Sequence, residues 1–293
     1  MGEQRRTPAI GIIATLVVGG LVVLAGSDGS VEAGGVPVFA LCGALAFVIN
    51  WVVFVPSNAA RTEHYFDLTG AVTYITVVLV AAALADDLDT RGVVVTSMVV
   101  VWALRLGSFL FRRVKRDGRD GRFDRIKLDP LRFFMTWTLQ GLWVLLTLAC
   151  ALAIVTGTDR ERFGVLAVVG TLVWAVGFVV EVVADQQKST FRRDPANAGR
   201  FISSGLWRWS RHPNYFGEIT LWTGIAIIAV PVLSGWRWVA LVSPVFVAVL
   251  LIRISGIPAL ERRGAKRWGD DPTYQEYVRT TSLLLPRPPG ASR

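Results

Sequence analysis

Apolar runs of about 20 residues, almost free of charged side chains, recur along this 293-residue chain. A helix of that length crosses the hydrocarbon core of a bilayer, which is about 30 Å thick. The chain is 53% hydrophobic and yet carries a formal charge of +9, a combination that suits a soluble globule poorly. The runs therefore predict an all-α, polytopic bundle of transmembrane helices.

We expect eight spans, with seven as the alternative. They are placed at residues 8–26, 37–55, 66–85, 92–111, 133–156, 164–184, 216–234 and 236–256. The first run is too long and lacks a small-residue cleavage site, so we interpret it as a retained helix and not a signal peptide. Because no repeat or long linker divides the sequence, we expect one transmembrane domain over 1–293, with a flexible tail at 287–293.

Lysine and arginine collect in three segments, at 112–132, at 185–215 and in the tail after Ser255. Alternation through eight spans places these segments on one side of the membrane, together with Arg5 and Arg6. By the positive-inside rule, both termini of this multi-pass protein are expected in the cytoplasm, with the spans in the inner (plasma) membrane. Topology and anionic headgroups account for the charge, so membrane lipids, and not nucleic acid, are the expected partners.

The two cysteines, Cys42 and Cys150, both lie inside predicted spans. No Cys-x-x-Cys pattern and no Cys/His cluster accompanies them, so neither a disulfide framework nor a metal site is expected. We interpret both as small apolar packing residues.

The densest set of polar residues at the entry to a span is the segment 211–218, which reads Arg-His-Pro-Asn-Tyr-Phe-Gly-Glu. Pro213 disfavours helix at His212 and suits a first helical turn, so His212 lies in the entering loop and Glu218 about one turn inside the span. Asn214 both donates and accepts hydrogen bonds, which suits a carboxamide such as that of nicotinamide. The segment is therefore a candidate site for an anionic cofactor beside an apolar substrate.

Two carboxylates, Glu181 and Asp185, lie four residues apart on one face of the helix that ends the sixth span. Carboxylates at that depth are costly unless they are paired or face water. In the functional interpretation Asp185 accepts from a ribose or amide group while Arg192 contacts phosphate. The alternative is a structural ion pair at the helix end.

Glu63 and Tyr65 lead into the third span, where they could polarise a carbonyl or transfer a proton. The alternative is a helix N-terminus at which Glu63 and Asp67 complement the positive end of the helix dipole. A glycine-punctuated basic loop at 118–124 also has two interpretations, since it either wraps phosphates or only sets topology. Gln140 is an exception on an otherwise aromatic face of the fifth span.

These residues resemble the bacterial uncharacterised integral membrane family of the steroid 5-alpha-reductase superfamily. The resemblance runs from about Arg61 to Pro286 and is strongest over 181–217, including Ala-Asp-Gln-Gln-Lys at 184–188 and the segment 211–218. It implies a seven-helix-type membrane reductase core in which cytoplasmic loops hold NADPH and hydride passes to the double bond of an enone. The extra first helix at 8–26 has no counterpart in such a core.

The resemblance also implies roles for single residues. Glu218 matches an acid near cofactor and substrate, and Glu63 is the counterpart of a carbonyl-polarising glutamate. Tyr65 is a third candidate catalytic residue, on the chemistry of its hydroxyl and not on the resemblance. The candidate cofactor-binding residues are Asp185, Arg192, Arg200, Arg211, His212, Asn214, Tyr215 and Tyr277. Thr-Thr-Ser at 280–282 stands where the reductases carry a basic Ser-Arg-Lys, so phosphate contacts do not carry over to that part of the tail.

The chain is also similar to the related isoprenylcysteine carboxyl methyltransferases, which bind S-adenosylmethionine. This similarity rests on Arg-His-Pro-x-Tyr followed by a Glu, and then on Glu261, Gly269, Tyr274 and Tyr277. That group carries paired glutamates in the tail, whereas here Arg262 follows Glu261. The longer match over 185–217 favours the reductase.

We therefore expect a membrane-embedded, NADPH-dependent reductase that acts on a conjugated carbon–carbon double bond of a lipophilic substrate, steroid-like, polyprenyl or fatty. One alternative is an S-adenosylmethionine-dependent membrane methyltransferase of the same architecture. The other is a non-enzymatic lipid-binding or transport protein whose basic loops serve only topology.

Overall fold

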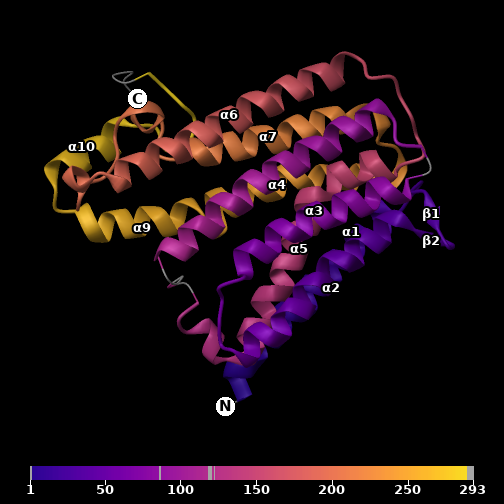
Figure 1. Ribbon diagram of the computed structural model, residues 1–293, viewed down its shortest axis with the longest axis horizontal. Coiled ribbons are helices and arrows are strands. Elements are labelled where there is room, and N and C mark those ends of the chain that lie inside the picture. The colour runs from indigo at the N-terminus through magenta and orange to yellow at the C-terminus, as the bar shows by residue number, and fades with distance from the viewer. Residues whose placement is uncertain (1, 86, 118–120, 122, 289–293) are drawn as a thin grey trace. The chain divides into compact units, whose positions relative to one another are not determined.

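The computed structural model describes residues 2–85, 87–117, 121 and 123–288, and the part it describes is almost entirely helical (Figure 1). The α-helices are α1 (Gly2–Gly26), α2 (Val38–Ala59), α3 (Phe66–Leu84), α4 (Thr90–Asp117), α5 (Pro130–Thr156), α6 (Val165–Arg193), α7 (Pro213–Ala229), α8 (Val242–Val249), α9 (Ile257–Trp268) and α10 (Pro272–Thr280). Short helical turns are η1 (Ile126–Leu128), η2 (Pro195–Asn197), η3 (Gly205–Arg208), η4 (Val230–Val232), η5 (Gly235–Leu241) and η6 (Leu250–Ile254). Two short strands, β1 (Glu32–Ala33) and β2 (Val36–Pro37), pair antiparallel.

Eight helical segments of the described chain are long and apolar enough to cross a membrane, which confirms the predicted all-α, polytopic architecture. They are Thr7–Gly26, Val38–Ala59, Phe66–Leu84, Thr90–Arg112, Pro130–Thr156, Val165–Arg193, Pro213–Val232 and Gly235–Trp268. The sixth and eighth extend further than expected, because polar turns continue the helix beyond the apolar run. Asp185 consequently lies well inside α6 and not at its end.

Contacts within the chain divide it into two compact units. The single transmembrane domain expected from the sequence remains a prediction. The first unit comprises Met1–Ala167 and Ile228–Ser243, and α5 is its central helix. Asp129 caps α5 by accepting from two backbone N–H groups, and Pro130 occupies the first helical position. Because α5 is apolar all round and packs against α1, α2, α3 and α4, it is almost completely buried. Cys42 and Cys150 are buried, as packing residues would be.

The second unit comprises Val168–Ile227 and Pro244–Arg293, and its α6 and α7 run side by side in Figure 1. Glycines bring the two backbones into direct contact. A Cβ added to Gly177 would lie 2.5 Å from the backbone nitrogen of Leu221, and one added to Gly217 would lie 2.6 Å from that of Glu181. Close packing of this kind is typical of membrane helices with small residues at the interface. It sets Glu181 on α6 directly against the start of α7.

Two helices follow the last apolar run, the polar and basic α9 and then α10, which was not predicted. Asp271 caps α10 by accepting from the backbone N–H of Thr273, and Pro272 follows at the first helical position. This Asp-Pro pair is a helix-start signal that the sequence did contain. The flexible tail predicted for 287–293 lies largely outside the described residues.

Candidate functional site

The loop between α6 and α7 is anchored on the last turns of α6 by Trp207. The indole of this buried residue donates to the carbonyl of Ala184 (3.0 Å), and the Lys188 ammonium lies 4.2 Å from its ring centre. The side chain of Gln187 accepts from the backbone N–H of Leu206 (2.9 Å). The α6 residues in these contacts are Ala184, Gln187 and Lys188. Because each lies within three positions of Asp185, the contacts hold the loop beside Asp185.

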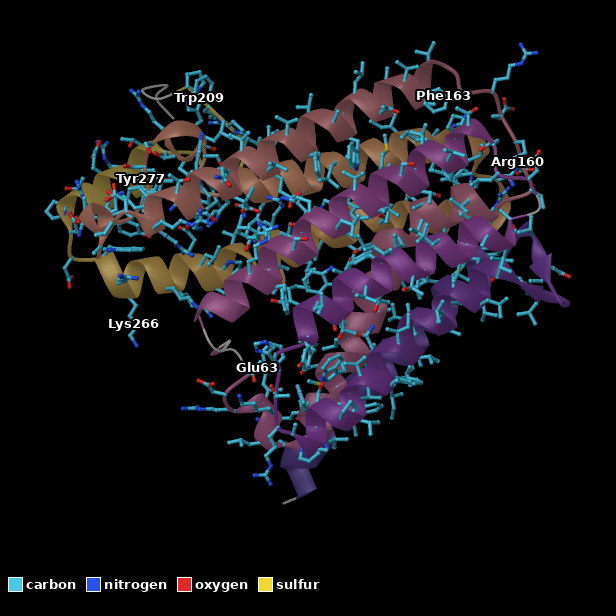
Figure 2. All side chains as sticks on the ribbon, viewed as in Figure 1. Glu63, Arg160, Phe163, Trp209, Lys266 and Tyr277 are labelled. Carbon is cyan, nitrogen blue, oxygen red and sulfur yellow. The ribbon has the colours of Figure 1, made fainter. Side chains whose placement is uncertain are left out.

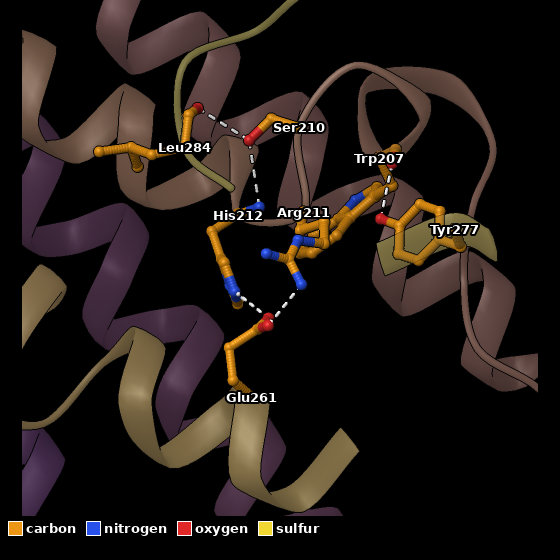
Figure 3. Close-up of polar contacts among 7 residues, drawn as sticks. All are labelled: Trp207, Ser210, Arg211, His212, Glu261, Tyr277 and Leu284. Atoms are coloured by element: carbon orange, nitrogen blue, oxygen red, sulfur yellow. Dashed lines mark hydrogen bonds and ion pairs between the residues drawn. The ribbon is translucent and has the colours of Figure 1, made fainter. Parts of the chain in front are cut away.

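The tail after α10 is bound to the other end of this loop (Figure 3). Ser210 Oγ donates to the carbonyl of Leu284 (2.8 Å), and the backbone N–H of Arg211 donates to the carbonyl of Ser282 (2.8 Å). Tyr277 on α10 donates its hydroxyl to the carbonyl of Trp207 (2.7 Å). The tail and α10 therefore fix the backbone that carries Arg211 and His212.

Glu261 on α9 contacts both of these residues (Figure 3). Its Oε2 lies 2.5 Å from Arg211 Nη1, and its Oε1 lies 2.8 Å from His212 Nε2. His212 also stacks on Tyr215, with ring centres 5.7 Å apart and planes 12° from parallel. The site residues Arg211, His212 and Tyr215 are thus brought together. Glu261 was not among the expected cofactor residues, although the methyltransferase-like tail pattern contained it.

Burial lowers the pKa of His212 below its ordinary value of 6.5, with Glu261 opposing the shift, so the imidazole is neutral at pH 7. The carboxylate of Glu261 accepts from Nε2–H, which assigns the proton to Nε2 and leaves Nδ1 as an acceptor. His212 is 4% exposed, and within the described chain its Nδ1 has no hydrogen-bond partner.

We expect acidification below about pH 6.5 to destabilise the folded protein through His212. Because the folded-state pKa is the lower one, the unfolded state binds more protons, and stability present above 6.5 is lost as the pH falls through the folded value. The measurement is the free energy of unfolding against pH for the wild type and for His212→Gln. The substitution should flatten this dependence; an identical slope in both proteins would contradict the expectation.

A second pair joins α6 to α7 beside this cluster. Asn214 Nδ2 donates to Asp185 Oδ1 (3.2 Å), and Asp185 is 7% exposed. The Oδ1 of Asn214 is buried and lacks a hydrogen-bond partner within the described chain. Together with His212 Nδ1 it makes two unsatisfied acceptors at the start of α7. A hydrogen bond from a donor group of a bound molecule to either atom would be favourable.

The remaining expected cofactor and acid residues of this unit are Glu218, Arg192, Arg200 and Tyr277. Glu218 is half-buried on α7, about one turn after Asn214. Arg192 and Arg200 are exposed at the end of α6 and in the following loop. The hydroxyl of Tyr277 is already engaged by Trp207.

Glu63, which is labelled in Figure 2, and Tyr65 belong to the first unit and lie in the segment that precedes α3. Glu63 is 7% exposed, and its Oε2 forms an ion pair with Lys127 Nζ at 2.6 Å. Tyr65 is 51% exposed. Lys127, 64 positions away, was not anticipated as a partner.

Two other features of the first unit bear on the predictions. Gln140 is the polar residue on the otherwise aromatic face of α5. Its Nε2 donates to the carbonyl of Phe66 (3.0 Å) and so holds the start of α3 in place. The basic loop at 118–124 was a candidate for wrapping phosphates. Its residues 118–120 and 122 lie outside the described chain.

Comparison with known proteins places this site within a matched region. A family model described as "Protein of unknown function (DUF1295)" matches residues 53–281, a range that begins inside α2 and leaves out α1. An uncharacterised protein of Schizosaccharomyces pombe is 27% identical over 186 residues, 52% of this chain and 54% of that protein. A probable O-methyltransferase, ustE, of Ustilaginoidea virens is 34% identical over 67 residues, 22% of this chain and 23% of that protein.

These curated relatives are matched over about half of their length or less. No solved structure matches the chain.

Proposed function

The chain belongs to the DUF1295 family, which is in the steroid 5-alpha-reductase-like group, and from this membership we propose an NADPH-dependent membrane reductase. The proposed reaction reduces a conjugated carbon–carbon double bond in a lipophilic substrate. One observation carries the proposal: within the described chain, Asn214 Oδ1 and His212 Nδ1 are two buried acceptors without hydrogen-bond partners at the start of α7, and Asn214 itself donates to Asp185. Leaving such a group unsatisfied costs roughly 1–3 kcal/mol, and the amide and ribose hydroxyls of a nicotinamide nucleotide are donors that fit.

The charge around this set also suits a dinucleotide. Four arginines are exposed at the end of α6 and in the loop that follows it, namely Arg192, Arg193, Arg200 and Arg208. Guanidinium groups bind phosphate through short, charge-assisted hydrogen bonds, often two at a time. NADPH carries three phosphates, whereas S-adenosylmethionine carries none. This difference favours the dinucleotide.

When bound, NADPH would supply the hydride. The chain's own groups would orient the nicotinamide amide through Asn214 and His212, and the ribose through Asp185. Glu218, in the same unit as these residues, is the proposed catalytic acid, and catalytic roles for Glu63 and Tyr65 of the first unit are proposed from the sequence alone. In the first unit the Glu63 side chain pairs with Lys127, and the Tyr65 hydroxyl is a hydrogen-bond donor of the kind that suits a carbonyl oxygen on which negative charge develops.

A methyltransferase is the second candidate, and Glu261 is the observation that favours it. Glu261 binds Arg211 and His212, so the residues shared with the isoprenylcysteine methyltransferase pattern form one contact group. The probable O-methyltransferase of U. virens, similar over a short stretch, points the same way. S-adenosylmethionine would then occupy the same unit of the protein.

Direct binding separates the candidates. The purified full-length protein in detergent should bind NADPH and not S-adenosylmethionine, as measured by isothermal titration calorimetry. Asn214→Ala should weaken NADPH binding about tenfold to a hundredfold, the range for a buried polar contact, and Arg192→Ala should weaken it and reduce its salt dependence.

Gln275→Ala is the matched control, because it removes an exposed amide on α10. Its affinity for NADPH should equal that of the wild type. Tight binding of S-adenosylmethionine alone would establish the methyltransferase instead. If the protein bound neither NADPH nor S-adenosylmethionine, the remaining candidate would be a lipid-binding protein.

A further inference from the structure

The helix α9 packs one face against the second unit and exposes the other. On the packed face Ile257 and Gly264 are buried, and Glu261 contacts His212 of the loop before α7. The exposed face carries four cations, Arg262, Arg263, Lys266 and Arg267. Figure 2 shows Lys266 pointing away from the rest of this unit. We call these four residues the basic face of α9.

The spacing of the four cations makes them one continuous stripe. Arg262 and Lys266 are four positions apart, as are Arg263 and Arg267, so the members of each pair are neighbours along the helix surface. The two pairs are one position apart and therefore lie next to each other. Like charges four positions apart repel and destabilise a helix. An anionic surface laid against the stripe would compensate this repulsion.

The chain does not neutralise this charge itself. Within the described residues, no carboxylate forms an ion pair with any of the four cations. Glu261 of the same helix instead pairs with Arg211 and His212 on the packed face. Arg267 lies over the ring of Trp268, 4.9 Å from its centre, a contact that orients the guanidinium and leaves its charge in place. The basic face is therefore available to an anion from outside the chain.

The position of α9 along the chain places the basic face close to the membrane surface. The eighth segment that is long and apolar enough to cross a membrane, Gly235–Trp268, ends with α9. Because a helix rises about 1.5 Å per residue, Arg262 lies about 8 Å and Arg267 about 15 Å along the axis from the start of α9. Long cationic side chains can also extend back toward the headgroups. This range lies within the reach of the surface potential of a membrane, which extends about 8 Å beyond the headgroups at physiological ionic strength.

We propose that the basic face of α9 binds the headgroups of anionic phospholipids, in the leaflet on the side predicted to be cytoplasmic. Basic clusters that directly follow a span or lie on an amphipathic helix are typical of segments that bind such lipids. The sequence predicted membrane lipids as partners and assigned them no place, and this stripe supplies one. The surface is independent of which nucleotide the protein binds. Because Glu261 on the packed face contacts His212, lipid bound to α9 would also stabilise the candidate functional site.

The test compares thermal unfolding of the full-length protein in detergent micelles that contain dioleoyl phosphatidylglycerol or dioleoyl phosphatidylcholine. A ligand that binds the folded state raises the unfolding temperature. For the wild type, the anionic lipid should raise this temperature by about 5 °C relative to the zwitterionic lipid, and native mass spectrometry should show the anionic lipid retained. Added salt should reduce both effects, because it screens the attraction.

The test variant converts the basic face to four glutamines, through Arg262→Gln, Arg263→Gln, Lys266→Gln and Arg267→Gln. Glutamine is a good helix former and like-charge repulsion is removed, so this variant should stay folded. It should lose the rise in unfolding temperature and bind phosphatidylglycerol at least about tenfold more weakly.

The matched control removes the same number of charges from exposed arginines that lie on four different segments, Arg125, Arg162, Arg279 and Arg287, each replaced by glutamine. This control should respond to phosphatidylglycerol as the wild type does. If it lost the response as fully as the test variant, net charge and not the basic face would be responsible, and the proposal would be wrong. An unchanged response in the test variant would also refute it.

Soluble anions provide the last arm of the experiment. Inorganic phosphate and polyglutamate, each added to the wild type in phosphatidylcholine micelles, should not raise the unfolding temperature. If phosphate raised it as much as phosphatidylglycerol does, the basic face would be a site for free phosphate. If polyglutamate did so, the face would fit an acidic protein, and in either case the assignment to lipid would be overturned.

Discussion

Gly217→Ala is expected to destabilise the protein by about 2–3 kcal/mol and to abolish nucleotide binding. The added methyl group would lie 2.6 Å from two backbone atoms of α6, the nitrogen of Glu181 and the carbonyl oxygen of Gly177. Backbone atoms cannot rotate away as a side chain can, so α6 and α7 must separate. That movement pulls Asn214 away from Asp185. Thermal unfolding in detergent and NADPH titration measure the two effects.

Gly20→Ala provides the matched control for this substitution. Gly20 lies within α1, and nothing comes within 4 Å of an added Cβ. Alanine is a better helix former than glycine, so this variant should be as stable as the wild type or slightly more stable. If Gly217→Ala behaved in the same way as Gly20→Ala, the close contact between α6 and α7 would be refuted.

Removal of Glu261 should have the second large effect. Glu261→Ala leaves Arg211, with its side chain only 10% exposed, and His212 without their shared acceptor. An uncompensated buried charge costs about 3 kcal/mol or more, and the site residues on the loop lose their fixed orientation. We therefore expect lower thermal stability together with loss of nucleotide binding.

A double-mutant cycle with Arg211→Ala isolates this interaction. Because the double variant no longer carries the buried charge, it should be less destabilised than the sum of the two single variants. Glu276→Ala is the control, since it deletes the same group from an exposed pair with Arg279 and should change stability by less than about 1 kcal/mol. Additive single effects in the cycle would show that Glu261 and Arg211 do not interact.

The eight spans were predictable because each is encoded locally. The length and polarity of a single run decide whether it crosses a bilayer, whichever partners it has. The start of α7 at Pro213 was predictable for the same reason, since proline restricts its own position and the one before it. The resemblance likewise singled out Asp185 and Asn214, which the structure joins by a hydrogen bond.

The partners of the candidate residues were not predictable in this way. Glu261 and His212 are 49 positions apart, and Lys127 and Glu63 are 64 positions apart. Nothing in the local sequence decides which cation a carboxylate reaches, because this depends on how whole helices pack. The glycines of α6 and α7 did carry a signal, since small residues at membrane helix interfaces allow backbones to approach.

The attachment of the tail to the loop has a consequence for the order of events during biosynthesis. Ser210 and Leu284 are 74 positions apart, and α7, α8, α9 and α10 are all made between them. The hydrogen bond between Ser210 and Leu284 can therefore form only after the ribosome has translated residue 284, although the loop is synthesised much earlier. A nascent chain that has inserted every membrane span still lacks these contacts, so we expect the proposed site to bind its nucleotide only when the polypeptide is nearly complete.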